Sequence, residues 1–87
     1  MALYSVSIKT SAGKELAAVG SKPDRQRIVE RIQGLASNRR PYGSEKLAGY
    51  SDRYRIRQGN YRIIYLIDDD AQVVTIYKVG DRKDVYR

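Results

Sequence analysis

The 87-residue chain contains no cysteine and no histidine. Without cysteine, a disulfide scaffold, a thiolate nucleophile and a cysteine-ligated zinc site are excluded. Without histidine, the chain lacks the commonest metal ligand and the commonest general acid or base near neutral pH. No apolar run approaches the roughly 20 residues that span a membrane, and the first residues do not resemble a signal peptide. We therefore expect a cytoplasmic protein without a membrane segment, metal or cofactor.

Positive charge dominates the polar residues. Lys and Arg number 17 against 10 Asp and Glu, which gives a formal net charge of +7 and a pI near 9.9. Such a domain concentrates anions around it, and nucleic acid is the most abundant candidate partner. The alternative is a basic surface that only keeps the protein soluble. The stretch 53–62 contains Arg53, Arg55, Arg57 and Arg62 and no acidic residue.

The first half of the chain predicts one strand and two helices. Residues 3–9 alternate between apolar and polar side chains, which is typical of a half-buried strand. Thr10 and Ser11 are suited to cap a helix, which Gly20 would stop. Pro23 is tolerated in the first turn of a second helix. The apolar stripe of this second helix consists of Ile28, Val29, Ile32, Leu35 and Ala36.

The second half predicts a loop and three strands. Alternation and β-branched residues indicate the strands, and Gly, Pro, Asn and Asp mark the turns between them. The middle strand is nearly continuously apolar, so we expect it to be central and covered on both faces. The predicted elements are a loop over 37–43, an irregular lead-in over 46–49, strands over 53–57, 61–67 and 73–79, a turn at Gly59–Asn60, a turn over 68–70, and a strand end at Gly80.

These elements predict one α+β domain over residues 1–87, in the order β-α-α-β-β-β. A helical hairpin needs an apolar surface to cover, and one face of a twisted, mostly antiparallel sheet supplies it. Strict alternation then places Tyr54 and Ile56 toward the core. It leaves Arg53, Arg55 and Arg57 on the opposite face of the sheet, as a cradle for a phosphate backbone.

Four stretches together resemble the RelE/ParE toxin superfamily, and within it the RelE-like mRNA interferases of bacterial toxin–antitoxin pairs. In order and spacing they cover essentially the whole chain, and the last two favour the RelE-like branch. The stretches are Ala12-Gly-Lys-Glu-Leu16; Arg40-Pro-Tyr-Gly with Glu45-Lys-Leu-Ala-Gly49; Tyr54-Arg-Ile-Arg-Gln-Gly-Asn-Tyr-Arg-Ile-Ile-Tyr65; and Val79-Gly-Asp-Arg-Lys-Asp-Val-Tyr86.

The resemblance implies an RelE-like fold and an endoribonuclease that enters the ribosomal A site and cuts mRNA there. It also implies an acidic antitoxin, encoded alongside, that wraps the toxin and blocks its cationic face. The chain departs from its relatives at Asp81, where many have His and others a basic residue. The catalytic positions carried over by the resemblance are Arg55, Arg57, Arg62, Arg82 and Tyr86. We further expect substrate contacts from Lys46, Arg53, Lys83, Arg39 and Arg40, the last two on ribosomal RNA phosphate.

Cleavage of RNA through its own 2′-OH requires two proton transfers and stabilisation of the phosphorane's charge. Arginine can clamp the phosphate and stabilise charge, but it stays protonated and is no ordinary base. A tyrosine in a cationic pocket has its phenolate favoured, and it can also stack on a base. We therefore favour Tyr86 among the candidates for proton transfer, which are Tyr86, Lys46, Lys83, Asp81 and Asp84.

Alternatives stay open for several of these residues and for the protein as a whole. The three strand arginines could simply form an exposed polar face, and Arg62 could pair with Asp52 or with an aspartate of the C-terminal tail. The Asp68–Asp70 run is better explained as a solvated turn than as a metal site. Tyr54, Tyr61, Tyr65 and Tyr77 are expected to pack in the core or at its rim. The rival functions are a ParE-like inhibitor of DNA gyrase and an inactive toxin that binds RNA or antitoxin.

Overall fold

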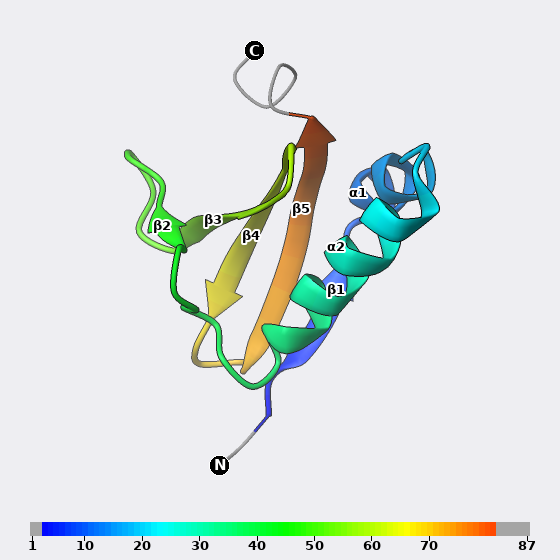
Figure 1. Ribbon diagram of the computed structural model, residues 1–87. Helices are drawn as coiled ribbons and strands as arrows, with labels where there is room; N and C mark the ends of the chain where they lie inside the picture. The colour runs from blue at the N-terminus through cyan, green and yellow to red at the C-terminus, as the bar shows by residue number, and fades with distance from the viewer. Residues whose placement is uncertain (1–2, 82–87) are drawn as a thin grey trace.

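The computed structural model describes residues 3–81 as two helices lying on one face of a curved sheet (Figure 1). The predicted site residues Arg82, Lys83 and Tyr86 lie outside the described residues. The elements are β1 (Ser5–Ile8), α1 (Thr10–Ala17), α2 (Lys22–Gly34), β2 (Glu45–Lys46), β3 (Arg53–Gln58), β4 (Tyr61–Asp68) and β5 (Val73–Asp81). This order confirms the predicted β-α-α-β-β-β arrangement and adds the two-residue strand β2, where we expected irregular chain.

The five strands form one sheet in the order β1-β5-β4-β3-β2. β1 runs parallel to β5, and the other neighbours are antiparallel. β4 is central, as its apolar run predicts, but within residues 3–81 helices cover only one of its faces (Figure 1). The β3–β4 turn is the predicted one: Gly59 has φ +60, a conformation that glycine adopts without steric cost.

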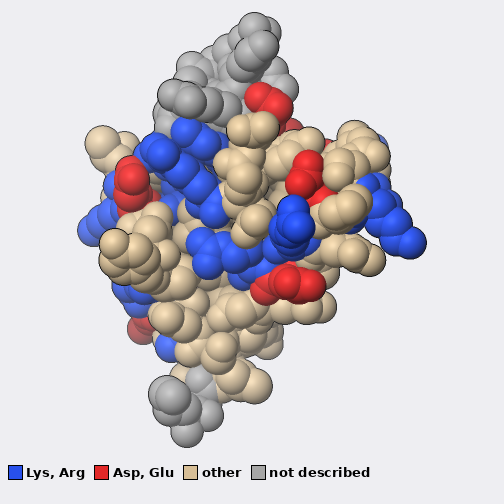
Figure 2. Space-filling view, in the orientation of Figure 1, with Lys and Arg blue, Asp and Glu red and all other residues tan. Residues whose placement is uncertain are grey.

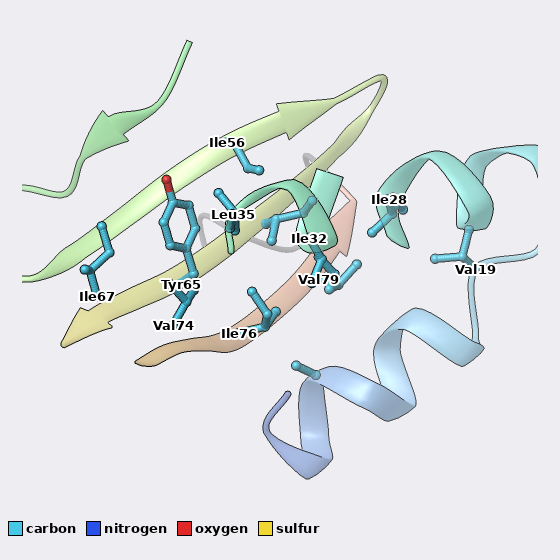
Figure 3. Close-up of a cluster of buried hydrophobic side chains, with 12 residues drawn as sticks. Val19, Ile28, Ile32, Leu35, Ile56, Tyr65, Ile67, Val74, Ile76 and Val79 are labelled. Atoms are coloured by element: carbon cyan, nitrogen blue, oxygen red, sulfur yellow. The ribbon is translucent and has the colours of Figure 1, made fainter. Parts of the chain in front are cut away.

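The hydrophobic core fills the space between α2 and the covered face of the sheet (Figure 3). Ile28, Ile32 and Leu35 of the predicted stripe are at most 3% exposed. They face every second residue of the strands, because successive side chains of a strand point to opposite faces of the sheet. The buried strand residues are Ile56, Ile63, Tyr65, Ile67, Val74, Ile76 and Val79, and Ala12 and Val19 complete the cluster.

Helix α1 begins directly where β1 leaves the sheet. The predicted caps are wrong: Lys9 is the N-cap residue without a side-chain cap, and Thr10 is already helical. The Lys9 N–H donates to the Ile76 carbonyl (3.0 Å), and this last ladder bond holds Lys9 extended until the helix starts. The helix also ends at Ala17, before Gly20. No helix within residues 3–81 is long and apolar enough to cross a membrane.

Helix α2 starts close to the predicted position. Ser21 is its N-cap residue, its hydroxyl accepts the Asp24 N–H (3.4 Å), and Pro23 occupies the first turn. At the entrance to the helix, Arg25 donates to the Val19 carbonyl (2.9 Å). Val19 belongs to the link between α1 and α2, so this bond ties the start of α2 to the chain that leaves α1.

Helix α1 supplies hydrogen-bond partners to the part of β5 that extends beyond β1. β1 pairs with β5 only as far as Ile76. Beyond that point, the Glu15 carboxylate accepts the Val79 N–H and the Lys78 ammonium, each at 3.1 Å. On its other edge β5 stays paired with β4 as far as Asp81, so it continues through Gly80, which we expected to end the strand.

The loop between α2 and β2 is fixed by a network around Arg39 and Arg40. The Arg39 guanidinium lies 3.8 Å from the centre of the Tyr4 ring. Arg40 donates to Asp69 (3.2 Å) and to the Tyr54 hydroxyl (3.1 Å). Tyr4 donates to the same carboxylate at 2.7 Å. The network joins the loop to Tyr4 just before β1, to β3 and to the β4–β5 turn, which is the turn predicted for the aspartate run.

This network shifts the protonation of its members. The hydrogen bond from Tyr4, followed by that from Arg40, lowers the pKa of Asp69. The hydrogen bond to Asp69 raises the pKa of Tyr4. Tyr65, stacked on Tyr54 beside the network, has its pKa raised to about 12, mainly by burial. The ionised Asp69 and the neutral Tyr4 are therefore the forms that the folded state favours.

We predict that Asp69→Asn weakens the acid dependence of folding. Because the pKa of Asp69 is lower in the folded protein, its stabilisation is present above the ordinary Asp pKa of about 4 and is lost as pH falls through the folded-state value. Denaturant unfolding at a series of acidic pH values should therefore show a steeper fall in unfolding free energy for wild type than for D69N. Asp70→Asn is the control, since it removes the same charge from an exposed position in the same turn. Equal slopes in wild type and D69N would contradict this role.

Candidate nucleic-acid interface

The face of the sheet turned away from the helices carries a cluster of arginines, which we call the arginine face. It consists of Arg53, Arg55 and Arg57 of β3 and Arg62 of β4. Ile56 and Ile63 are directly paired and buried in the core. The residues next to them along each strand therefore point to the face away from the helices. Figure 2 shows Lys and Arg side chains gathering over the strands in the middle of the view.

Arg57 and Arg62 are direct cross-strand partners in the β3–β4 ladder. Side chains at such positions have Cβ atoms about 4.5–5.5 Å apart, and like charges placed there destabilise a sheet. Arg55 lies two residues from Arg57 on the same strand and the same face. The register thus brings three predicted catalytic residues, Arg55, Arg57 and Arg62, to one place. A cluster that costs stability in this way is typical of a binding site for anions.

Arg62 is buried, with only 4% of its surface exposed. Its partner on β5 is Gly80, which carries no side chain, so the arginine lies beside bare backbone. The alternative that Arg62 pairs with Asp52 is wrong. The backbone carbonyl of Asp52 accepts the Ile67 N–H at the far end of the hairpin. Ile67 lies five positions along β4 from Arg62, which is about 16 Å of strand.

Arg55 has an acidic partner on the edge strand β2. Glu45 pairs with Arg55 in the ladder, and its carboxylate accepts a hydrogen bond from the guanidinium. The Arg55 side chain is 13% exposed and that of Glu45 is 57% exposed. Sequence analysis did not single out Glu45, because two residues of strand are too short to show alternation. Its carboxylate competes with any phosphate that approaches Arg55.

Other predicted site residues lie elsewhere. Lys46 pairs with Tyr54, on the helix side of the sheet. Arg39 and Arg40 belong to the network at the α2–β2 loop, away from the arginine face. Asp81 pairs with Tyr61. Asp81, Tyr61 and Glu15 line a hollow of about 300 Å³ beside α1.

Tyr77, expected in the core or at its rim, is half-buried and does not belong to the core cluster. Across the hairpin of β4 and β5, Tyr65 pairs with Ile76 but Ile64 pairs with Lys78, so Tyr77 is the extra residue of a bulge. The Arg53 guanidinium lies 5.0 Å from the centre of its ring, which places Tyr77 on the arginine face. The alternation of side chains along the sequence of β5 does not reveal this bulge.

We predict that Glu45→Gln strengthens binding of single-stranded RNA. The change removes the carboxylate that competes with phosphate for Arg55, so one more phosphate contact should form and the log–log salt slope should steepen by about 0.7. Titrations of an oligoribonucleotide at several salt concentrations measure both the affinity and the slope.

The control for this change is Glu30→Gln, which removes the same charge from an exposed position on α2. We expect only the general effect of net charge from E30Q. If both variants gained affinity equally, Glu45 would have no specific role at Arg55.

Comparison with known proteins places this chain among toxins of toxin–antitoxin systems. The family described as "ParE toxin of type II toxin-antitoxin system, parDE" matches residues 6–86. Toxin RelG of Mycobacterium tuberculosis is 44% identical over 34 residues, and the match spans 39% of this chain and 39% of RelG.

Solved structures of RelE toxins match almost the whole chain. RelE in the archaeal RelE–RelB complex of Pyrococcus horikoshii is 30% identical, with a TM-score of 0.82 over 94% of this chain and 98% of that one. A double arginine-to-alanine mutant of E. coli RelE in the free state is 28% identical, with a TM-score of 0.79 over 99% and 92%. RelE in the intact E. coli RelBE complex is also 28% identical, with a TM-score of 0.76 over 90% and 95%.

These matches confirm the fold and the resemblance stated from the sequence. The family description covers nearly the whole chain, and the archaeal RelE shares the fold over almost its full length. The protein therefore belongs to the ParE toxin family of type II toxin–antitoxin systems, within the RelE/ParE superfamily, and its nearly full-length structural relatives include RelE toxins.

Proposed function

We propose that the protein is a ribosome-dependent endoribonuclease that cuts mRNA in the ribosomal A site and so stops translation. The observation that carries this proposal is the juxtaposition of Arg55, Arg57 and Arg62 by the β3–β4 register. Guanidinium groups gathered on one face can bind a phosphodiester through paired hydrogen bonds and can stabilise the further negative charge that develops on it during cleavage. A surface kept basic only for solubility does not need two arginines in direct cross-strand contact.

In the proposed reaction, the 2′-oxygen loses its proton and attacks the adjacent phosphorus. The bond from phosphorus to the 5′-oxygen breaks, and that oxygen gains a proton. The products are a 2′,3′-cyclic phosphate and a new 5′-hydroxyl end. Arg55, Arg57 and Arg62 hold the phosphate and stabilise the negative charge that builds on its oxygens. Because arginine stays protonated, these residues do not move the protons.

The proton-transfer step rests on residues assigned by the family resemblance. Arg82 and Tyr86 belong to the C-terminal stretch outside the described residues, with Arg82 supporting the phosphate and Tyr86 transferring a proton. Lys83 is assigned to the substrate in the same way. Asp81 stands where relatives carry His or a basic residue, and it pairs with Tyr61 on β4. Tyr86 therefore remains our choice over Asp81.

Dependence on the ribosome follows from this division of roles. The arginine face can bind a phosphate and stabilise charge, but it does little to align the 2′-oxygen with the breaking bond. Alignment supplies a large part of the rate of such reactions. A ribosome that holds mRNA in its A site supplies that alignment from outside the toxin. The cytoplasm is the compartment where this substrate occurs.

The partner in this proposal is an acidic antitoxin. The matched structures of P. horikoshii and E. coli include RelE–RelB complexes. An acidic segment lying over the arginine face would neutralise its like charges and exclude RNA from it. The same surface would then serve both the substrate and the inhibitor.

We predict that Arg55→Ala and Arg57→Ala each reduce cleavage by about 10²–10³-fold, the usual loss for one preorganised donor to a transition state. A defined mRNA is translated with purified protein, with and without ribosomes, and the new 5′ ends are mapped. Wild type should cut only with ribosomes, at codon-defined positions. Arg27→Ala is the control, because Arg27 is equally cationic, lies on α2 and has a 62% exposed side chain.

Undiminished cleavage by both arginine variants would reject the proposed site. A gyrase supercoiling assay on the same preparations tests the rival function, a ParE-like inhibitor of DNA gyrase. Inhibition of gyrase without mRNA cuts would replace the nuclease proposal with a ParE-like one. Binding of RNA or antitoxin without growth arrest would indicate an inactive toxin.

A further inference from the structure

Four side chains form a column of alternating rings and cations next to the arginine cluster. The Arg53 guanidinium lies 4.4 Å from the centre of the Tyr50 ring and 5.0 Å from that of Tyr77. The Lys9 ammonium lies 5.1 Å from the centre of the Tyr77 ring. We call this set the tyrosine column: Tyr50, Arg53, Tyr77 and Lys9. Its members come from segments up to 68 positions apart in the chain, so the fold assembles it.

The tyrosine column continues the arginine face. Arg53 lies two residues from Arg55 on β3, and alternation directs both to the same side of the sheet. Two residues of strand span about 6.6 Å. The column therefore begins one side-chain position away from the groups that bind the scissile phosphate in the proposed function.

The fold does not need this column for its core. Tyr50 is 48% exposed and precedes β3, and neither it nor Arg53 belongs to the buried cluster. Cation–π contacts at exposed sites are worth about 0.5–1 kcal/mol each. This gain in stability is small for an arrangement that fixes three long side chains and keeps the large ring of Tyr50 at the surface. The column therefore points to a role in binding.

Nucleobases are the ligands that such a column fits. A base stacks on an aromatic ring whatever its identity, and it also stacks on the plane of an arginine. The cations of the column and the neighbouring arginines attract the phosphates that accompany each base. In the column the guanidinium is already held between rings, so less side-chain freedom is lost when RNA binds.

The geometry points to a second RNA subsite, in which the tyrosine column holds an unpaired base of the strand whose phosphate lies at Arg55, Arg57 and Arg62. This inference rests on the proposed function, since it takes single-stranded RNA as the ligand. Arginines that contact only the backbone are indifferent to whether bases are present. The column makes binding depend on the bases themselves.

The test compares two probes with the same number of phosphates: a short single-stranded oligoribonucleotide and its abasic counterpart. Stacking of one base is worth about 1–3 kcal/mol, so wild type should bind the base-bearing probe about five- to 150-fold more tightly. Tyr50→Leu and Tyr77→Leu should each reduce this ratio at least several-fold and leave the affinity for the abasic probe unchanged. Tyr50→Phe and Tyr77→Phe should retain the ratio, because the ring and not the hydroxyl stacks.

Tyr42→Leu is the matched control, since Tyr42 is fully exposed and belongs to the α2–β2 loop. It should leave both affinities unchanged. Thermal unfolding identifies any variant that has lost its fold, and Tyr50, at the surface, then decides the outcome if Tyr77→Leu unfolds. Equal binding of the two probes by wild type would overturn the inference, as would leucine variants that keep the ratio. A loss of antitoxin binding with an unchanged ratio would also overturn it and assign the column to the protein partner.

Failure of this subsite is distinguishable from failure of the proposed function. If wild type discriminates between the probes but cuts no mRNA on ribosomes, the subsite holds and the nuclease proposal fails. If ribosomal cleavage occurs and requires Arg55 and Arg57, but the probes bind equally, the nuclease proposal holds and the subsite fails. The two readouts are the ratio of the two probe affinities and the cleavage of mRNA on ribosomes. They are independent because the abasic probe reports only on phosphate contacts, so the ratio isolates the contribution of the bases.

Discussion

The register of the β3–β4 hairpin is the constraint on which both the core and the arginine face depend. It pairs Ile56 with Ile63 on one face and Arg57 with Arg62 on the other. A slip of one residue would move every side chain of a strand to the opposite face. The two-residue turn at Gly59 prevents such a slip, because turn geometry sets the pairing of the flanking strands. One short turn therefore fixes the fold and the site together.

The two faces of this hairpin contribute to stability with opposite signs. Burial of each isoleucine on the helix side is worth about 1.5–3 kcal/mol. On the other side, the cross-strand arginines repel each other, and such a contact costs on the order of 1 kcal/mol. Glu45 offsets part of this repulsion from the edge strand. The apolar side is strong enough to hold the cations together, which explains why a cluster of arginines can lie on so small a sheet.

Much of the fold could be predicted from the sequence because its signals are local. Alternation in β3, the stripe on α2 and the Gly59–Asn60 turn each depend on a few adjacent residues, and the structure has all of them. The arginines of β3 follow from the same alternation. Arg62, by contrast, lies in an apolar strand, and only the pairing with Arg57 explains its place in the cluster.

The features that sequence analysis missed depend on residues that are distant in the chain. The bulge at Tyr77 arises from the pairing of β5 with β4, and Arg40 meets Asp69 only when the loop folds back on the sheet. The caps expected at the start of α1 failed because a hydrogen bond from Lys9 to Ile76 decides where β1 ends. Strand β2 is too short to carry any periodic signal.

The crowding of guanidinium groups makes the protein's folding stability depend on what covers this surface. Any ligand that binds only the folded state raises its stability, by an amount that grows with ligand concentration and affinity. A polyanion on this surface would also remove internal repulsion. If the antitoxin binds where the proposed function places it, its loss would therefore uncover the arginines and at the same time lower the protein's resistance to unfolding and proteolysis.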